Sequence, residues 1–356
     1  MDMPKKEMKQ IPVGTIRIKA RDLGVYEKTK ASWKKSSKQF PSAMNVINLF
    51  KAHGCLDALI DEKNSGFLKG QVSPDGKAQG ARIDMLPDGS KLDKAFSLFA
   101  EHLTVHDETS HDHWDVIYKN PGGTFSYVYT VDKDIKSIRK KYRVVEEFGK
   151  YYSTIKNNVY SALRKKDDYT ALPMYTLLKT YMRIGNEIYY KAHGHKGLTT
   201  LKKKDISIKG DNVEFNYLSK GGVPRKINER FPKLYIEKLR KLIKPLNNSS
   251  FVFVNPSTNR PLRDVHFKHA FRKYCGREFY PHVMRSYYGT EKAKEFLKAH
   301  KTATKEEVQG LFLAIAEKLG HKRFVKKEHA WKDSYNVTIH HYIQPKILER
   351  VNGLVE

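Results

Sequence analysis

Apolar residues recur every three or four positions between residues 132 and 163, and lysine or arginine fills many of the positions between them. This spacing is typical of an amphipathic helix, so we predict one long helix, or two in register, with a basic outer face. The apolar positions are Ile135, Ile138, Tyr142, Val145, Phe148, Tyr152, Ile155, Val159 and Leu163. Lys165-Lys166-Asp167-Asp168 interrupts the pattern, and a second apolar helix is predicted over about 171–192.

Short segments separated by glycine-containing turns follow. They predict a tight β-hairpin region whose second turn, Lys220-Gly221-Gly222, carries a lysine. The predicted strands are 205–208, 213–218 and 223–227. Helical spacing then resumes at 232–244, 264–275, 281–299 and 304–319. Pro345 is well placed to start a final short helix, because its missing N–H costs nothing there.

The first 130 residues have a different, turn-rich character. Ser73-Pro74-Asp75-Gly76 and Leu86-Pro87-Asp88-Gly89 are strong turn signals. Strands are predicted at 81–85, 114–118 and 124–131, and helical spacing is seen at 43–51 and 92–103. We therefore predict an α+β protein of two domains. Residues 1–130 form a smaller mixed α/β domain, and residues 131–356 form a mostly α-helical domain with a small β-hairpin sheet.

The charge balance indicates a polyanionic partner. The chain has 67 Lys and Arg against 39 Asp and Glu, a net charge of +28. Residues 1–130 hold 19 basic and 16 acidic residues, whereas residues 131–356 hold 48 and 23, so the excess is +3 in one domain and +25 in the other. The excess positive charge creates an electrostatic field that attracts DNA. On charge alone, RNA or a membrane surface are alternatives.

Two further features narrow the class of protein. Cys55 and Cys275 are the only cysteines, so we expect no disulfide framework and a reducing compartment. No run of 18 apolar residues exists, and the start of the sequence lacks an apolar signal core. We expect an intracellular protein that does not span a membrane.

Exchange of a DNA phosphodiester requires neutralised oxygens, a nucleophile and an acid for the leaving oxygen. Arg183 can fork onto a phosphate, and Lys220 on a hairpin turn can supply a proton. Each has an ordinary alternative, because Arg183 could pair with Glu187 one helical turn away and Lys220 could be a solvated turn residue. No carboxylate cluster of the kind that metal nucleases use is visible in the basic region.

Three motifs in this region resemble the core of the bacterial and poxvirus-type DNA topoisomerases IB. They are Arg183-Ile184-Gly185-Asn186-Glu187, Gly197-Leu198-Thr199-Thr200-Leu201 and Ser219-Lys220-Gly221-Gly222. The resemblance implies that Arg183 stabilises the phosphate and that Lys220 is the general acid. Ser219 stands where the family usually has glycine.

The resemblance continues toward the C-terminal end of the sequence. Arg285, followed by Ser-Tyr-Tyr-Gly-Thr, resembles the second family arginine, and Leu319-Gly320-His321 resembles the element whose side chain donates to the phosphate. His282 creates the His-x-x-Arg box of tyrosine recombinases, where topoisomerases more often have lysine. An alternative for His321 is a helix C-cap.

Tyr342 is the predicted nucleophile among 21 tyrosines, because Tyr342-Ile343-Gln344-Pro345 resembles the family's Tyr-Ile-x-Pro signature. The interval from His321 to Tyr342 is longer than the family's usual spacing of about nine residues. The extra segment is basic and aromatic, and we predict a loop that touches DNA. Tyr335 within it is the alternative nucleophile.

The resemblance covers about 132–356 and implies a topoisomerase IB, a monomer clamped around duplex DNA, which forms a 3′-phosphotyrosyl intermediate without ATP or metal. No Gly-x-x-x-x-Gly-Lys-Ser/Thr loop is present, so no nucleotide cofactor is predicted. A DNA-associated location follows, in the nucleoid or cytoplasm, or in a virion or viral factory. The predicted DNA-binding residues are Lys202, Lys203, Lys204, Arg225, His282, Lys322 and Arg323.

Two other functions remain open, a site-specific tyrosine recombinase and an inactive DNA-binding homologue. A histidine-rich stretch in the first domain also has spacing that could chelate a transition metal, but it matches no zinc motif, and we predict no metal site. Its members are His102, His106, Asp107, Glu108, His111, Asp112 and His113.

Overall fold

The structure, a computed structural model, describes residues 11–80, 82–106 and 114–355. The chain divides into two compact units, Met1–Arg139 and Lys140–Glu356. The division falls inside the long helix α2 (Val131–Ala162), whereas the sequence placed it at 130/131. In the described residues, no helix is long and apolar enough to cross a membrane.

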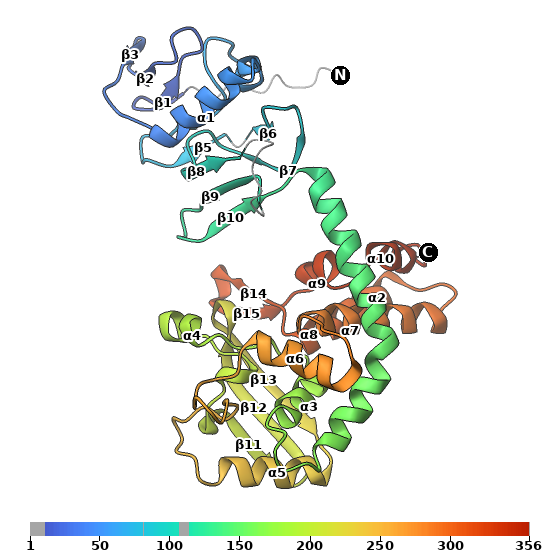
Figure 1. Ribbon diagram of the computed structural model, residues 1–356. Coiled ribbons are helices and arrows are strands. Elements are labelled where there is room, and N and C mark those ends of the chain that lie inside the picture. The colour runs from blue at the N-terminus through green and yellow to red at the C-terminus, as the bar shows by residue number, and fades with distance from the viewer. Residues whose placement is uncertain (1–10, 81, 107–113, 356) are drawn as a thin grey trace. The chain divides into compact units, whose positions relative to one another are not determined.

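The first unit is built from small antiparallel sheets and one helix (Figure 1). One sheet has the order β3-β2-β1-β4-β5, and another has the order β10-β9-β8. Helix α1 (Pro41–Ala52) buries Val46, Ile47 and Phe50 in the core of the unit. The strands are β1 (Ile16–Ile18), β2 (Val25–Lys28), β3 (Trp33–Lys35), β4 (Gln71–Val72), β5 (Ala78–Gln79), β6 (Ile83–Met85), β7 (Lys91–Phe96), β8 (Glu101–Val105), β9 (Val116–Lys119) and β10 (Phe125–Val128).

The helix predicted at 92–103 is wrong, because this stretch forms β7, a turn and β8. Leu92 and Phe96 are both buried. A spacing of four places two residues on one face of a helix and also on one face of a strand, so the pattern alone could not distinguish the two. The helix at 43–51 and the strands at 114–118 and 124–131 are confirmed by α1, β9 and β10.

The histidine-rich stretch lies only partly within the described residues. His102 and His106 are described, but Asp107, Glu108, His111, Asp112 and His113 are not. Within the described ranges, no group of three or more His, Cys, Asp and Glu side chains could hold a metal ion.

In the second unit, α2 buries one apolar face that includes Tyr142, Val145 and Phe148, as predicted. The helix predicted over 171–192 is interrupted at residues 181–186, and helices lie on both sides of the interruption. Helix α3 (Ala171–Thr180) ends at Tyr181, which takes a left-handed conformation with φ of 53°, and α4 (Glu187–His193) is a separate short helix. Arg183 therefore lies in the non-helical segment between them.

The predicted hairpin region is confirmed as a three-stranded antiparallel sheet, β11 (Ile206–Lys209), β12 (Asn212–Ser219) and β13 (Val223–Arg230). Helix α3 packs against β13 (Figure 1). Lys220 occupies the turn between β12 and β13. The remaining predicted helices are confirmed as α5 (Lys233–Ile243), α6 (Asp264–Cys275), α7 (Val283–Ala299) and α8 (Lys305–Leu319).

The segment between His321 and Tyr342 is not the loop that we predicted. It folds into a hairpin, β14 (Lys322–Val325) and β15 (Ala330–Asp333), followed by helix α9 (Asn336–His341). Phe324 packs against Trp331 across this hairpin, with ring centroids 5.4 Å apart. Helix α10 (Pro345–Asn352) follows with proline in its first turn. The protein is of the α+β class, as predicted.

Candidate active site

Tyr342 caps the C-terminal end of α9 and is 3% exposed. Arg183 Nη2 donates a hydrogen bond to the Tyr342 hydroxyl oxygen over 3.2 Å. The two residues are 159 positions apart in the sequence, so the fold creates this contact.

Arg285 on α7 lies against the same tyrosine and is 2% exposed. Its Nη1 donates to the Tyr181 carbonyl over 2.6 Å, and its Nη2 donates to the Leu319 carbonyl over 2.9 Å. The guanidinium carbon lies 5.1 Å from the centroid of the Tyr342 ring. Two backbone carbonyls therefore fix the guanidinium plane, and within the described residues its buried Nε has no hydrogen-bond partner.

His321 completes a cluster around Tyr342, with the two ring centroids 4.7 Å apart. Its Nε2 is 3.0 Å from Arg285 Nη2, and its Nδ1 is 2.7 Å from the Thr338 hydroxyl. Burial, and then the nearby charges of Arg285 and Arg183, lower the pKa of His321 to about 2. The imidazole is therefore neutral at ordinary pH.

His282 also lies beside Tyr342, with ring centroids 5.3 Å apart. Burial and the charges of Arg285 and Arg183 lower its pKa to about 3. His282, which was predicted to bind DNA, thus lies in the immediate surroundings of Tyr342.

Lys220 is exposed and faces the same region from the β12–β13 turn. It lines a hollow of about 190 Å³ together with Arg183, His282 and Arg285. A second hollow of about 500 Å³ is lined by Lys220, Arg183 and His321 among others. The structure thus brings the predicted site residues Arg183, Arg285, His321 and Tyr342 together and places Lys220 at the edge.

The recognised motifs have a packing role next to Arg183. A Cβ atom on Gly185 would lie 2.8 Å from the Thr200 backbone nitrogen, and one on Gly197 would lie 2.6 Å from the Arg183 carbonyl oxygen. The Leu198 amide donates to the Arg183 carbonyl over 2.8 Å. The two glycines therefore let the backbone that carries Arg183 dock on the 197–200 turn. Glu187 pairs with Lys191 at 2.7 Å, so the alternative Arg183–Glu187 pair is not seen.

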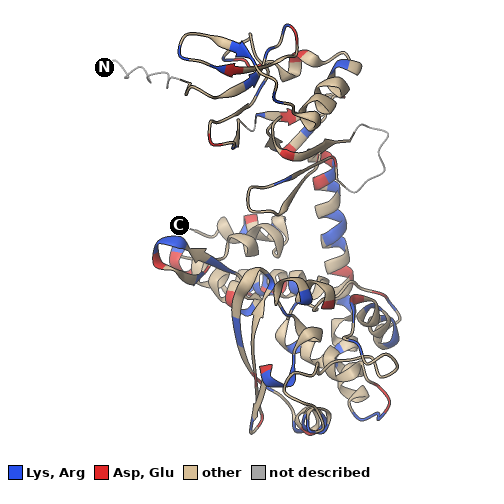
Figure 2. Cartoon of the chain, turned by 90° about the vertical axis from the view of Figure 1, so that its left-hand side faces the viewer, with Lys and Arg blue, Asp and Glu red and all other residues tan. Residues whose placement is uncertain are grey.

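The predicted DNA-binding residues fall into two groups. Arg225 is buried, and its guanidinium donates to the Glu317 and Lys318 carbonyls, so it braces the end of α8. Lys203 donates to the Leu246 carbonyl over 2.6 Å. Lys204 and Arg323 are exposed, whereas Lys202 and Lys322 are half-buried. Figure 2 shows lysines and arginines along α2 and across the second unit.

Tyr335, the alternative nucleophile, caps the start of α9 and packs against Phe312, with ring centroids 5.8 Å apart. It belongs to the apolar cluster of α7, α8 and α10. The arginine contacts described above are made to Tyr342.

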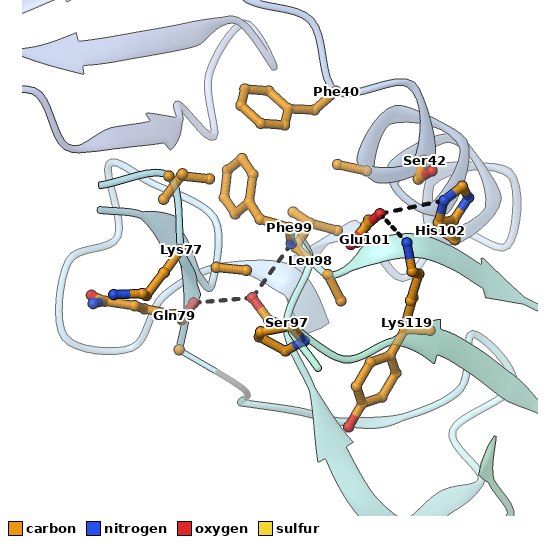
Figure 3. A pocket seen from close by; sticks show the side chains of 18 of the residues that line it. Phe40, Ser42, Lys77, Gln79, Ser97, Leu98, Phe99, Glu101, His102 and Lys119 are labelled. Atoms are coloured by element: carbon orange, nitrogen blue, oxygen red, sulfur yellow. Dashed lines mark hydrogen bonds and ion pairs between the residues drawn. The ribbon is translucent and has the colours of Figure 1, made fainter. Parts of the chain in front are cut away.

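The first unit also has a hollow, of about 620 Å³, lined by apolar side chains such as Phe40 and Phe99 (Figure 3). Its charged groups are already paired, because Glu101 lies 2.9 Å from Lys119 Nζ and 3.4 Å from His102 Nε2. This hollow therefore lacks the converging arginines found around Tyr342.

The family model for the catalytic core of eukaryotic DNA topoisomerase I matches residues 133–344. The chain belongs to this family. The predicted membership in the superfamily of topoisomerases IB and tyrosine recombinases is thereby confirmed. None of the curated proteins matches the chain.

Two crystal structures of the XerH site-specific recombinase resemble the chain at 16% identity. One is a pre-cleavage complex bound to difH substrate, with a TM-score of 0.32, and the other is a post-cleavage complex bound to palindromic difH, with a TM-score of 0.31. Each match covers 48% of this chain and 45% of the recombinase chain, so the chain matches less than half of that protein's length.

Proposed function

We propose that the protein is a type IB DNA topoisomerase that nicks and reseals one strand of duplex DNA through a 3′-phosphotyrosyl intermediate. The observation that carries this proposal is the convergence of Arg183, Arg285 and His321 on the buried Tyr342. Cations and hydrogen-bond donors preorganised around a nucleophile are what phosphoryl chemistry requires. The family match over residues 133–344 supports the assignment.

In the proposed reaction, the Tyr342 hydroxyl loses its proton to water as its oxygen attacks the phosphorus atom, and the new bond to phosphorus forms as the bond to the 5′ oxygen breaks. Lys220 donates a proton to the leaving 5′ oxygen. The freed 5′-hydroxyl later attacks the same phosphorus, restores the strand and releases the tyrosine. One phosphoester is exchanged for another in each step, so the reaction needs no nucleotide.

The hydrogen bonds of His321 would allow its Nε2 to change from acceptor to donor when a phosphate binds. An arginine N–H can only donate, so His321 Nε2 accepts from Arg285 and its proton lies on Nδ1, toward Thr338. The threonine hydroxyl can donate or accept. When phosphate oxygens attract Arg285, His321 can take the other tautomer and donate from Nε2, while Thr338 donates to Nδ1.

DNA is the proposed partner of the protein, bound by a monomer with the first unit as the second half of a clamp. The excess charge of +25 in residues 131–356 supports this, because phosphate contacts dominate affinity for DNA. Lys202, Lys204, Lys322 and Arg323 are the proposed contact residues.

A site-specific tyrosine recombinase is the second candidate, and one observation favours it. His282 provides a His-x-x-Arg box and lies next to Tyr342, with ring centroids 5.3 Å apart. The chemistry would be the same, but strand exchange between paired sites would replace rotation.

Relaxation of a supercoiled plasmid tests the proposal. We expect the wild-type protein to relax positive and negative supercoils without ATP and in the presence of EDTA. Tyr342→Phe should form no denaturant-resistant adduct with DNA, whereas Tyr335→Phe should still form one. Strand exchange between two copies of one inverted repeat, without relaxation of unrelated plasmids, would instead identify a recombinase.

A further inference from the structure

Two neighbouring residues of α2 hold the backbone on both sides of Tyr342. The Lys141 Nζ donates a hydrogen bond to the carbonyl of His341. The Tyr142 hydroxyl donates to the carbonyl of Ile343 over 2.7 Å and is buried. The residues before and after the tyrosine are therefore both fixed to one helix, about 200 positions away in the sequence.

Helix α7 holds the same segment from another side. A Cβ atom on Gly289 would lie 2.6 Å from the Tyr342 carbonyl oxygen, so this position leaves no room for a side chain. The amide of Gln344 donates to the Thr290 hydroxyl over 3.2 Å. Residues 341–344 are thus held by contacts with both α2 and α7.

This support matters because the local helix cannot supply it. Helix α9 has six residues, and isolated helices of that length are unstable in water. Its last carbonyl groups also lack partners within the helix, as at every helix end. Tyr342 therefore depends on tertiary contacts for the backbone geometry from which it would attack.

We infer that Lys141 and Tyr142 are positioning residues for the nucleophile, which act by anchoring the carbonyls that flank Tyr342. This inference rests on the proposed function, in which Tyr342 attacks the phosphate. A reacting atom must be held close to its attack position, and a displacement of about 1 Å can cost on the order of 100-fold in rate.

Lys141 also adds a charge beside the phenol. Its Nζ lies 5.6 Å from the centroid of the Tyr342 ring and 5.1 Å from that of Tyr142. Within the described residues it makes no ion pair with a carboxylate, and burial lowers its pKa to about 8. A cation that is not neutralised favours the negative charge that develops on the Tyr342 oxygen as its proton leaves.

The test compares Tyr142→Phe, Lys141→Ala and Lys141→Arg with the wild-type protein in single-turnover formation of the covalent adduct, at saturating duplex DNA. Tyr142→Phe removes one hydroxyl and keeps the ring. We expect it and Lys141→Ala to slow adduct formation by about 10- to 100-fold while DNA affinity stays near wild type. Lys141→Arg keeps a charged donor and should retain most of the rate.

Lys140→Ala is the matched control, because it removes the same charge from an exposed neighbouring position on α2. It should leave the rate of adduct formation at saturating DNA unchanged. A melting curve for each variant shows whether the fold is kept at the assay temperature, and Tyr142→Phe decides the result if Lys141→Ala unfolds.

The inference is overturned if Tyr142→Phe forms the adduct as fast as the wild-type protein, or if Lys140→Ala loses as much rate as Lys141→Ala. Failure of the proposed function would look different. The wild-type protein would then form no adduct, or the adduct would persist in Tyr342→Phe.

Discussion

The exposed position of Lys220 on the β12–β13 turn makes a prediction at the scale of one side chain. Lys220→Ala should slow cleavage of an ordinary strand by roughly 10²–10⁴-fold, because the leaving 5′ oxygen loses its acid. A strand with sulfur at that 5′ position should be cleaved nearly as fast by the variant as by the wild-type protein, since a thiolate leaves without protonation. Equal loss on both strands would make Lys220 a phosphate-binding residue.

The two buried histidines predict a dependence of stability on pH. Their pKa values of about 2 and 3 in the folded protein lie below the ordinary value of 6.5. The unfolded chain therefore binds protons first as the pH falls, and stability present above pH 6.5 is lost progressively toward pH 3. The melting temperature of the His321→Asn variant should therefore fall less between pH 7 and pH 5 than that of the wild-type protein.

The control for this experiment is His269→Asn, an exposed position on α6. Its change in melting temperature between the two pH values should match that of the wild-type protein. If His321→Asn behaves like His269→Asn, the buried imidazole does not contribute to acid sensitivity.

At the scale of single residues, Arg183, Arg285 and His321, which meet at Tyr342, could be identified from the sequence. Each of them lies in a short motif that resembles the family. The sequence could not identify Thr338, Lys141 or Tyr142. Each acts through a contact with a residue distant in the sequence, and no local pattern marks such a contact. Arg225 was predicted to bind DNA, and no sequence pattern indicated that its guanidinium donates to carbonyls at the end of α8.

At the scale of elements, the close packing of α7 against Tyr342 can be tested with a pair of glycines. Gly289→Ala should lower the melting temperature and slow adduct formation, because its Cβ would lie 2.6 Å from the Tyr342 carbonyl oxygen. Gly310→Ala on α8 meets no atom within 4 Å, and it should stabilise the helix by up to about 1 kcal/mol. Equal effects at both positions would contradict the packing argument.

The periodic elements were predicted well, and α6 matches its predicted bounds of 264–275. The failures occurred where a pattern was compatible with two structures. The stretch 92–103 fits both periods, and the apolar pattern continues past Thr180 although the helix stops. The left-handed turn at Tyr181 and the docking of residues 183–185 on the 197–200 turn are tertiary effects.

At the scale of the whole chain, the uneven charge predicts where affinity for DNA resides. A fragment of residues 131–356 should keep much of the affinity, with a slope of log K against log salt of about −0.9 for each phosphate neutralised. A fragment of residues 1–130 should bind far more weakly. Equally tight binding by the 1–130 fragment and the full chain would refute the argument from charge.

The burial of Tyr342 has a consequence for the enzyme when no DNA is bound. A phenol that is 3% exposed and hydrogen-bonded to Arg183 is shielded from electrophiles and oxidants in its surroundings. A tyrosine-nitrating reagent should therefore modify exposed rings such as Tyr169 and Tyr280 first. Under the proposed function, the nucleophile is thus chemically protected when no DNA is bound, and a phosphate that attracts Arg183 would both free the Tyr342 hydroxyl and be its target.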